Sequence, residues 1–205
     1  MIIEPITIVG HIVRLEPLSI KHISDLAIAG QDEKIWQYML YGNVSTEEDM
    51  QRWVADILSR QANGTDLPFA IIHQETNRAI GATRFLNIRS DHFGVEIGGT
   101  WIGVEYQRTA VNTECKYLMM RHAFETWKCI RVQFKTDSRN VRSQCALERI
   151  GAKYEGTLRK HLITPTGQIR DSIFYSIIDS EWPEVKKKLE YLLCNGYTQQ
   201  KSSRR

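Results

Sequence analysis

The chain has 205 residues, 42% of them hydrophobic and 25% charged, so it can bury one sizeable core but is short for two domains. Its formal net charge of +3 and isoelectric point near 8.6 are mild, and part of the excess lies in the last five residues, so composition does not favour a nucleic-acid surface. The four cysteines lie far apart without a CxxC pair, which argues against a disulfide framework or a metal site and favours reduced thiols.

The opening residues, MIIEPITIVG, lack the basic start and the long apolar run of a signal peptide. No apolar run in the sequence reaches the length of a transmembrane helix. We therefore expect a cytoplasmic protein without a membrane partner.

The first part of the sequence predicts a strand and two helices. Residues 6–15 (ITIVGHIVRL) are rich in β-branched residues, with Gly10 as a turn or bulge, and residues 20–29 follow as a mixed helical segment. A second helix begins near the STEE sequence that starts at Ser45, and apolar residues at helical spacing continue it to about Ala62.

The centre of the sequence predicts three strands. Residues 67–73 (LPFAIIH) and 79–88 (AIGATRFLNI) are apolar and separated by a turn-type loop, so they predict a hairpin. Residues 93–104 supply a further strand, in which Glu96 stands alone among apolar and glycine residues. The pair Gly98-Gly99 permits a bulge or the close approach of a ligand.

The stretch WIGVEYQRTAVNTECKYLMMRHAFE, residues 101–125, predicts a strand that leads through a turn into a helix. Asn112 and Thr113 are candidate caps for this helix, which is expected to end near Trp127. A helix start presents unpaired N–H groups and the positive end of the helix dipole, so this turn can bind a pyrophosphate. The signal is weak by itself, because every strand–helix unit has such a helix start.

The C-terminal third predicts a strand, a helix, two strands and a final helix. The DSRN sequence that starts at Asp137 caps the first of these helices, and Gly151 ends it. Polar residues follow the last helix, so we expect one domain over residues 1–193 and a flexible tail over residues 194–205. The expected elements cover residues 130–136, 141–150, 153–161, 169–178 and 180–193.

Three ordered blocks of this sequence resemble one known family. They are EIGGTWIGVEYQRTAVNTECKYLMMRHAFE, VQFKTDSRNVRSQCALERIGAKYEGTLRKH and GQIRDSIFYSIIDSEWPEVK. Over roughly residues 8–193 the chain is similar to the GNAT N-acetyltransferases, in their ribosomal-protein-alanine-acetyltransferase-like branch. In one departure, Gln107 is followed by Ala110 and Asn112 where the phosphate loop of the family commonly carries glycine or alanine.

The resemblance implies an α/β (α+β) GNAT fold in a single domain, with a mixed, mostly antiparallel sheet of about seven strands flanked by helices. The sheet is expected to splay in the middle, where acetyl-coenzyme A (acetyl-CoA) fills the opening like a missing strand. A homodimer through the terminal strands or helix is also compatible with the resemblance. The residues that the resemblance assigns to acetyl-CoA are Ile102, Val104, Gln107, Arg108, Thr109, Ala110, Val111, Asn112, Thr113, Asn140 and Ser143.

Acetyl transfer to an amine requires a base, because a lysine-type amine has a pKa of about 10.4 and an α-amino group of about 8. Glu96 is the candidate base, because the resemblance implies this role and because the residue lies on a mostly apolar strand. The alternative is a buried carboxylate held by the backbone or by an arginine such as Arg84. Backbone N–H groups of residues 97–99 would stabilise the oxyanion.

The leaving thiolate can be protonated by a tyrosine in many members of the family, but Leu147 occupies that position here. The resemblance assigns the substitute role to the pair Asn140 and Ser143, three residues apart on one helix face. Asn140 would hold the pantetheine arm, and Ser143 would hydrogen-bond the sulfur or relay a proton to it. The alternative is that Asn140 only caps the helix and Ser143 is solvated.

The acceptor is expected to be a primary amine, on a protein N-terminus or a small molecule. The resemblance places its recognition near Trp36, Tyr38 and Tyr41, although these aromatic residues could equally pack in the core. We expect direct attack in a ternary complex, since no cysteine has the basic surroundings of an activated nucleophile, apart from the lysines at positions 116 and 128 beside Cys115 and Cys129.

Two other functions are compatible with the sequence. One is a catalytically inactive GNAT-fold protein that binds acyl-CoA, supported by the missing loop glycines and the missing tyrosine. The other is a nucleic-acid or ribosome-binding module, supported by dispersed arginines and the basic C-terminus but by no stacking motif. Binding of coenzyme A without activity would favour the inactive protein. A steep salt dependence of RNA binding would favour the nucleic-acid module.

Overall fold

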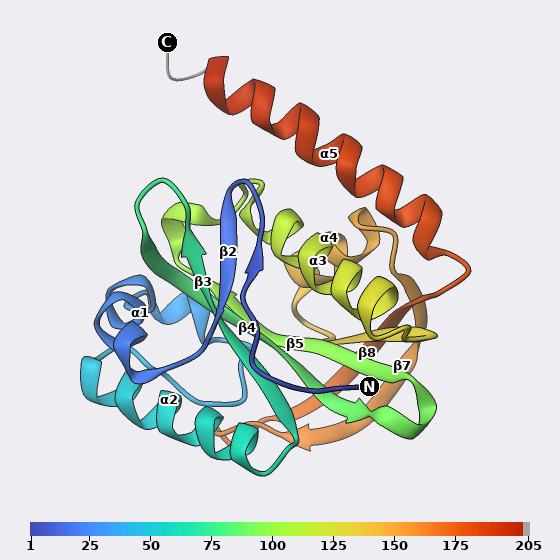
Figure 1. Ribbon diagram of the computed structural model, residues 1–205. Coiled ribbons are helices and arrows are strands. Elements are labelled where there is room, and N and C mark those ends of the chain that lie inside the picture. The colour runs from blue at the N-terminus through green and yellow to red at the C-terminus, as the bar shows by residue number, and fades with distance from the viewer. Residues whose placement is uncertain (203–205) are drawn as a thin grey trace.

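A single sheet of eight strands forms the middle of the computed structural model, which describes residues 1–202 (Figure 1). The strands lie in the order β1-β2-β3-β4-β5-β6-β8-β7. Their bounds are Ile8–Val9 (β1), Val13–Pro17 (β2), Asp66–His73 (β3), Arg78–Arg89 (β4), Gly94–Ile102 (β5), Arg131–Asp137 (β6), Lys153–Ile163 (β7) and Ile169–Ile178 (β8).

Helices cover both faces of this sheet, with α1 and α2 on one side and α3 and α5 on the other (Figure 1). The α-helices are Ile23–Ala29 (α1), Glu47–Ala62 (α2), Val111–Arg121 (α3), Val141–Arg149 (α4) and Trp182–Ser202 (α5). Short 3-10 turns cover Ile20–His22, Glu33–Ile35, Ser90–His92 and Val104–Tyr106, and a π-helical turn covers His122–Thr126. Within the described part of the chain, no helix has both the length and the apolar character needed to span a bilayer.

The sheet is antiparallel except where β5 meets β6. These two strands are parallel and pair at only three positions, of which Glu96 with Gln133 is the last. Beyond that pair, β5 continues to Ile102 and β6 to Asp137 without further pairing between them. The expected splay in the middle of a mostly antiparallel sheet is therefore confirmed.

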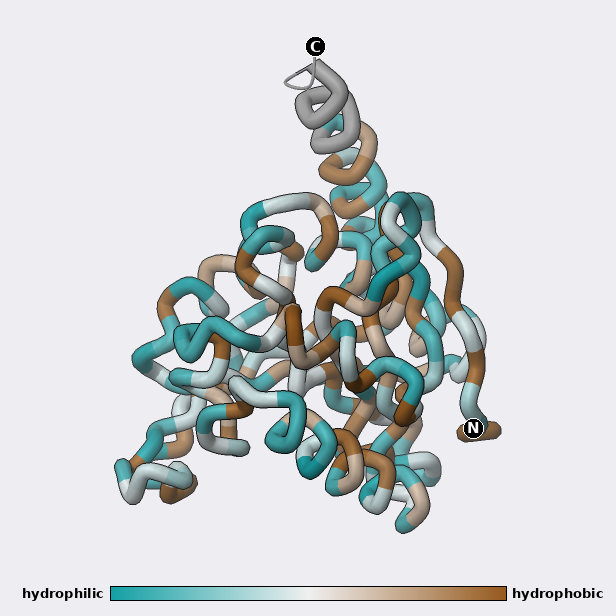
Figure 2. Tube along the Cα trace, turned by 90° about the vertical axis from the view of Figure 1, so that its left-hand side faces the viewer, coloured by the Kyte–Doolittle hydropathy of each residue, from teal (hydrophilic) through white to brown (hydrophobic). Residues whose placement is uncertain are grey.

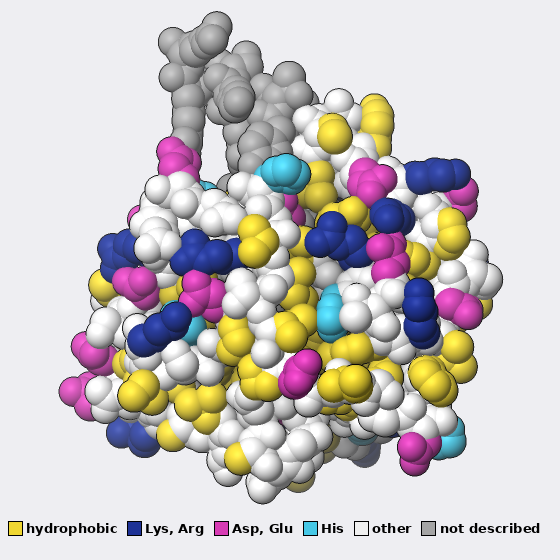
Figure 3. All heavy atoms as spheres, in the orientation of Figure 1, with side chains coloured by type: hydrophobic (Ala, Val, Ile, Leu, Met, Phe, Trp, Pro, Cys, Tyr) yellow, Lys and Arg dark blue, Asp and Glu magenta, His cyan; other side chains and the backbone are white. Residues whose placement is uncertain are grey.

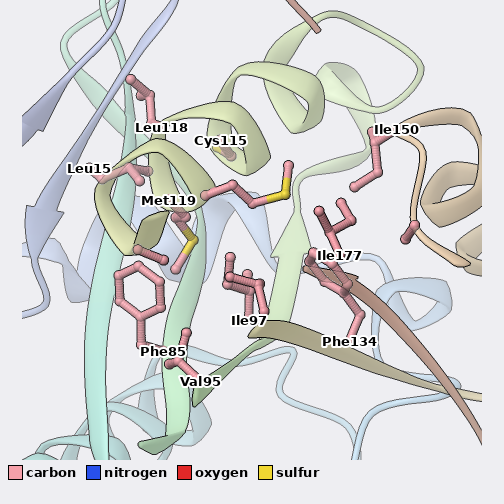
Figure 4. Close-up of a cluster of buried hydrophobic side chains, with 14 of the residues drawn as sticks. Leu15, Phe85, Val95, Ile97, Cys115, Leu118, Met119, Phe134, Ile150 and Ile177 are labelled. Atoms are coloured by element: carbon pink, nitrogen blue, oxygen red, sulfur yellow. The ribbon is translucent and has the colours of Figure 1, made fainter. Parts of the chain in front are cut away.

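On the α3 face of the sheet, apolar side chains from the helix pack directly against the strands. Figure 4 shows Leu118 and Met119 of α3 next to Phe85 of β4 and Ile97 of β5, and all four are at most 2% exposed. Burying a side chain of this size contributes roughly 1.5–3 kcal/mol relative to leaving it in water. This packing fixes the axis of α3, and with it the position of the helix start.

A tryptophan cluster forms the centre of the other face. Trp101 of β5 lies 5.0 Å from Trp36 and 5.8 Å from Trp53 of α2, measured between ring centroids. The indole N–H of Trp36 donates to the carbonyl of Gly30 at 2.8 Å, which satisfies its polar atom inside the core. In Figure 2, hydrophobic stretches concentrate in the interior of the molecule where strands and helices meet.

The segment predicted as one strand over residues 6–15 forms two strands, which is why the sheet has eight. A buried carboxylate from α3 holds the turn between them. Glu114 is 2% exposed and accepts backbone N–H groups from His11 at 2.9 Å and from Ile12 and Val13 at 2.7 Å each. A side chain at Gly10 would lie 2.6 Å from the Glu114 carboxyl carbon, so the turn requires glycine there.

Two helix ends differ from the sequence prediction. Asn112 and Thr113 were expected as caps of α3, but the helix starts at Val111 and both residues lie inside its first turn. Ala110 is the N-cap, and the hydroxyl of Thr109 before it accepts the Val111 N–H at 3.3 Å and donates to the Tyr106 carbonyl at 2.7 Å. At the other end of the chain, α5 extends to Ser202, nine residues beyond the expected 193, and residues 203–205 of the expected tail lie outside the described residues.

Candidate active site

The opening between β5 and β6 leads into a cavity of about 510 Å³. Its walls are the unpaired halves of the two strands, the loop before α3, parts of α3 and α4, and the segment around residues 35–41. This size lies within the usual range for a small-molecule site. The cavity therefore occupies the place where the sheet itself leaves backbone groups without a strand partner.

One end of the cavity is the loop that leads into α3. Gln107 bridges the loop to its surroundings, because its side-chain amide donates to the Ile102 carbonyl at 2.8 Å and its oxygen accepts from Arg142 of α4 at 2.7 Å. The loop is followed by the start of α3, whose free N–H groups and dipole favour an anion. Ala110 has φ −72 and ψ −9, an ordinary helical conformation, so the missing glycine there causes no strain.

The residues assigned to acetyl-CoA divide into two groups. Of those that do not line the cavity, Val104 is exposed, Val111 is part of the core, and the Thr113 hydroxyl accepts from Arg149 at 3.0 Å. Ala110 likewise lies outside the lining, at the N-terminal end of α3. The cavity brings together Ile102, Gln107, Arg108, Thr109, Asn112, Asn140 and Ser143.

Glu96 lies at the base of the opening, as the last residue of β5 that pairs with β6. It is 3% exposed, and one of its carboxylate oxygens accepts from the amides of Asn87 at 2.8 Å and Gln133 at 3.0 Å. The other oxygen is 3.7 Å from the Lys135 ammonium. Arg84, the alternative partner considered from the sequence, instead forms an ion pair with Asp66 at 3.1 Å. The carboxylate is thus held by neutral amides and faces the cavity.

The expected bulge in β5 follows directly after Glu96. Gly98 pairs with Arg84 and Trp101 pairs with Ala82, so two residues of β5 lie opposite one residue of β4. Gly99 has φ +58, and a side chain there would lie 2.8 Å from the Arg84 guanidinium, which explains the glycine. The bulge changes the course of β5 at the point where it parts from β6.

The α4 wall of the cavity carries Asn140 and Ser143. Asn140 caps α4, because its side-chain oxygen accepts the Ser143 N–H at 3.1 Å, and both residues line the cavity. Leu147 follows one turn later as a buried apolar residue of the lining. Tyr175, a nearby phenol, donates to Glu148 at 3.1 Å and lies outside the lining. The α4 residues that line the cavity therefore include a serine hydroxyl and the thiol of Cys145, and no tyrosine is among them.

At the opposite end, Tyr38 and Tyr41 line the cavity, whereas Trp36 lies in the tryptophan core. The Tyr41 hydroxyl accepts a hydrogen bond from Arg84, and burial raises the pKa of this phenol. Arg170 of β8 is buried and donates to the Tyr38 carbonyl at 3.3 Å, which attaches the segment to the sheet. Two tyrosines and the apolar residues Met39 and Leu40 therefore line this end of the cavity.

Lys116 also lines the cavity, although it was not among the residues expected there from the sequence. Its ammonium donates to the Thr100 hydroxyl at 2.8 Å, and the residue is only 7% exposed. Burial lowers the pKa of Lys116 from 10.5 to about 8. Its spacing in the sequence could have predicted this position, because Lys116 follows Asn112 by four residues and so lies on the same face of the helix.

Comparison with known proteins agrees with this geometry. Residues 13–153 match the family model described as an acetyltransferase (GNAT) domain. A T. thermophilus protein assigned as an acetyltransferase has 34% sequence identity and a TM-score of 0.86, over 94% of this chain and 100% of that one. A GCN5-related N-acetyltransferase from Brucella melitensis has 27% identity and a TM-score of 0.86, over 92% of this chain and 85% of that one.

A more distant structure, Mycobacterium smegmatis RimJ in complex with CoA-disulfide, has 18% identity and a TM-score of 0.77, over 92% of this chain and 95% of that one. At that identity the likeness concerns the fold. No match was found among curated proteins. Since the family model covers most of the chain and the splayed sheet has the fold of its members, this protein belongs to the GNAT acetyltransferase family, which implies binding of an acyl-CoA.

Proposed function

We propose that this protein transfers an acetyl group from acetyl-CoA to a primary amine by direct attack in a ternary complex. The observation that carries the proposal is the cavity at the parallel break in the sheet, with a helix start at one end and the buried carboxylate of Glu96 at its base. The residues present fit the cofactor. Free N–H groups at the start of α3 suit a pyrophosphate, and the unpaired edge of β5 suits the amide groups of a pantetheine arm.

Each wall of the cavity has a role in the reaction. Glu96 accepts the proton that the attacking amine loses, directly or through a water. Backbone N–H groups of residues 97–99, on the strand edge that lacks a partner, stabilise the oxyanion. Asn140 holds the pantetheine arm, and Ser143 hydrogen-bonds the sulfur. Tyr38 and Tyr41 contact the acceptor.

Direct attack is supported by the state of two cysteines. Burial raises the pKa of Cys115 to about 12 and that of Cys129 to about 11, so neither thiol ionises readily near neutral pH. Cys145 is exposed and lines the cavity, so it is the cysteine to exclude by experiment. Mass spectrometry of protein incubated with acetyl-CoA alone should find no acetyl adduct on Cys145, and such an adduct would contradict direct transfer.

The acceptor can be identified by a matched panel. Peptides with free N-termini, the same peptides with blocked N-termini, and small primary amines are incubated with acetyl-CoA while release of free thiol is followed. Thiol release that depends on a free amine, with acetylation of that amine in the mass spectrum, supports the proposal. Binding of acetyl-CoA without release on any acceptor would favour the inactive acyl-CoA-binding protein instead.

The alternative of a nucleic-acid module gains no observation from the structure. On the face shown in Figure 3, basic and acidic side chains are interspersed. Of the arginines that suggested it, Arg139 pairs with Asp137 at 2.7 Å and Arg131 pairs with Glu155 at 2.7 Å. Cytoplasmic location, the homodimer and the boundary between domain and tail at residue 193 remain predictions.

A further inference from the structure

Lys116 is a buried cation that has no role in the reaction proposed above. Its ammonium lines the cavity, donates to the Thr100 hydroxyl at 2.8 Å and lies 5.8 Å from the ring centroid of Phe134. None of the ion pairs among the described side chains includes Lys116. A buried charge without a carboxylate partner is costly, and one hydroxyl and one ring face compensate it only in part. A negative charge that arrives or develops in the cavity would complete the site.

The position of Lys116 indicates which negative charge this is. Thr100 belongs to the unpaired half of β5, and Phe134 is the first residue of β6 beyond the last pair, so the ammonium lies between the two parted strands. It is one helical turn, about 6 Å, further from the start of α3 than Asn112. The permanent charges of a pyrophosphate belong at the helix start. Lys116 lies deeper in the opening, where the thioester of acetyl-CoA would lie. The thioester is uncharged and becomes negative only during the reaction.

Two atoms of a thioester can become negative, the carbonyl oxygen and the sulfur. The unpaired edge of β5 already supplies N–H donors for the oxygen. On the α4 wall, Ser143 is a weak acid, Leu147 offers no proton, and the Cys145 thiol is exposed to solvent, whereas the Lys116 ammonium is buried at the parted strands. A thiol has a pKa of about 8.5, and a general acid is most effective when its own pKa lies near the pH at which the enzyme works. Burial lowers the pKa of Lys116 to about 8, which meets this requirement.

We propose that Lys116 is a further catalytic residue, which donates a proton from its ammonium to the sulfur of coenzyme A as the carbon–sulfur bond breaks. The amine nitrogen forms the new bond to the acetyl carbon, and the electron pair of the broken bond goes to sulfur with the Lys116 proton. The amine proton goes to Glu96. Exchange with solvent then returns a proton to Lys116 and removes one from Glu96. This proposal rests on the proposed function of the cavity.

Burial is what lowers the pKa of Lys116, and the titratable groups of the cavity come from α3, α4, β5 and β6. On α3 itself, Cys115 stays neutral because burial raises its pKa to about 12. Arg149 of α4 and Lys135 of β6 are further cations that line the cavity. Glu96, the carboxylate of the β5 wall, is bound by Asn87 and Gln133.

The first test follows the thiol of bound coenzyme A by the ultraviolet absorbance of its thiolate, with the acetyl-CoA complex as the blank. In the wild type, the Lys116 ammonium should make the bound thiol more acidic than free coenzyme A. In Lys116→Met, the acid dissociation constant of the bound coenzyme A thiol should be lower than in the wild type by at least about tenfold. In Lys116→Arg, which keeps the charge, the thiol should remain acidic. Equal thiol titration in the wild type and Lys116→Met would overturn the proposal.

The second test separates proton donation from charge. An arginine cannot release its proton, so kcat should fall by about 100-fold in Lys116→Arg as well as in Lys116→Met, with an unchanged KM for acetyl-CoA. Full kcat in Lys116→Arg would exclude proton donation. Acetyl-CoA affinity measured by calorimetry is the folding control, and Lys116→Gln replaces Lys116→Met if that variant does not bind. A wild type that binds no coenzyme A would overturn the proposed function together with this role, whereas binding with unaltered thiol titration overturns this role alone.

Discussion

Replacing Glu96 with glutamine should abolish most of the activity while leaving the fold intact. Both amide donors, from Asn87 at 2.8 Å and Gln133 at 3.0 Å, reach the same carboxylate oxygen. A glutamine can place its carbonyl oxygen there and keep both hydrogen bonds. Its NH₂ group then replaces the oxygen that lies 3.7 Å from Lys135, so that attraction is lost and the two remaining hydrogen bonds become neutral. We expect the free energy of unfolding to fall by less than about 2 kcal/mol.

The effect on catalysis should be far larger, because an amide cannot accept the proton of the attacking amine. Loss of a general base costs about 10²- to 10⁴-fold in rate. The assay measures kcat and KM with saturating acetyl-CoA and the best acceptor from the amine panel, beside a chemical unfolding curve and a calorimetric titration with acetyl-CoA. The expected result is a large loss in kcat with unchanged affinity for acetyl-CoA.

The matched control is Glu16→Gln, which removes a carboxylate outside the cavity lining. Hydrogen bonds from Lys21 and other basic neighbours lower the pKa of Glu16 to about 2, so this variant also loses real interactions. It should lower stability slightly and leave kcat unchanged. A Glu96→Gln protein that folds, binds acetyl-CoA and keeps kcat within about threefold of the wild type would refute Glu96 as the base.

Three further predictions concern Glu114, Lys116 and Cys145. Glu114→Gln puts an NH₂ group against backbone N–H donors of the β1–β2 turn, and it should lower the free energy of unfolding by about 2–4 kcal/mol in urea denaturation. Because burial lowers the pKa of Lys116 from 10.5 to about 8, the unfolded chain holds more protons between these pH values, so this group contributes stability that rises with pH across that window. Unfolding curves of Lys116→Met, measured across this pH window, should lack that contribution of about 3 kcal/mol. If the free energies of unfolding of the wild type and Lys116→Met changed in parallel with pH, the lowered pKa of Lys116 would be contradicted. Saturating acetyl-CoA should slow alkylation of Cys145 by at least about tenfold, while Cys194, exposed outside the lining, keeps its rate in the same mass spectrum.

Local patterns were enough to predict most elements of the fold. The strand pair β3–β4, the helix α2 with its Thr46 cap, and the Asn140 cap of α4 follow from alternation, helical spacing and capping residues that lie close together in the sequence. The splay at Glu96 was expected from the resemblance and not from the residues themselves. The expected role of Gly98-Gly99 as a bulge depended on glycine alone, and the register of β4 and β5 confirms it.

Features formed by distant segments could not be predicted in this way. The division of residues 6–15 into two strands depends on Glu114, about one hundred residues away in the sequence. Asn112 and Thr113 were expected as caps because of their residue types, but the N-cap is Ala110 and the Thr109 hydroxyl binds the first N–H of α3, so both residues lie inside the helix. The burial of Lys116 depends on how α3 lies over β5 and β6, which no local pattern contains.

Calorimetric titration of acetyl-CoA into the wild type, Ala110→Glu and Ala110→Gln tests the central claim most directly. Ala110 is the N-cap of α3, so a glutamate there places negative charge at the helix start where the pyrophosphate is expected, and glutamine is its neutral match in size. We predict micromolar binding by the wild type, a loss of at least about tenfold in Ala110→Glu, and a clearly smaller loss in Ala110→Gln. Equal affinities of the two variants would contradict a pyrophosphate at this helix start, and no binding by the wild type would contradict acetyl transfer by this cavity.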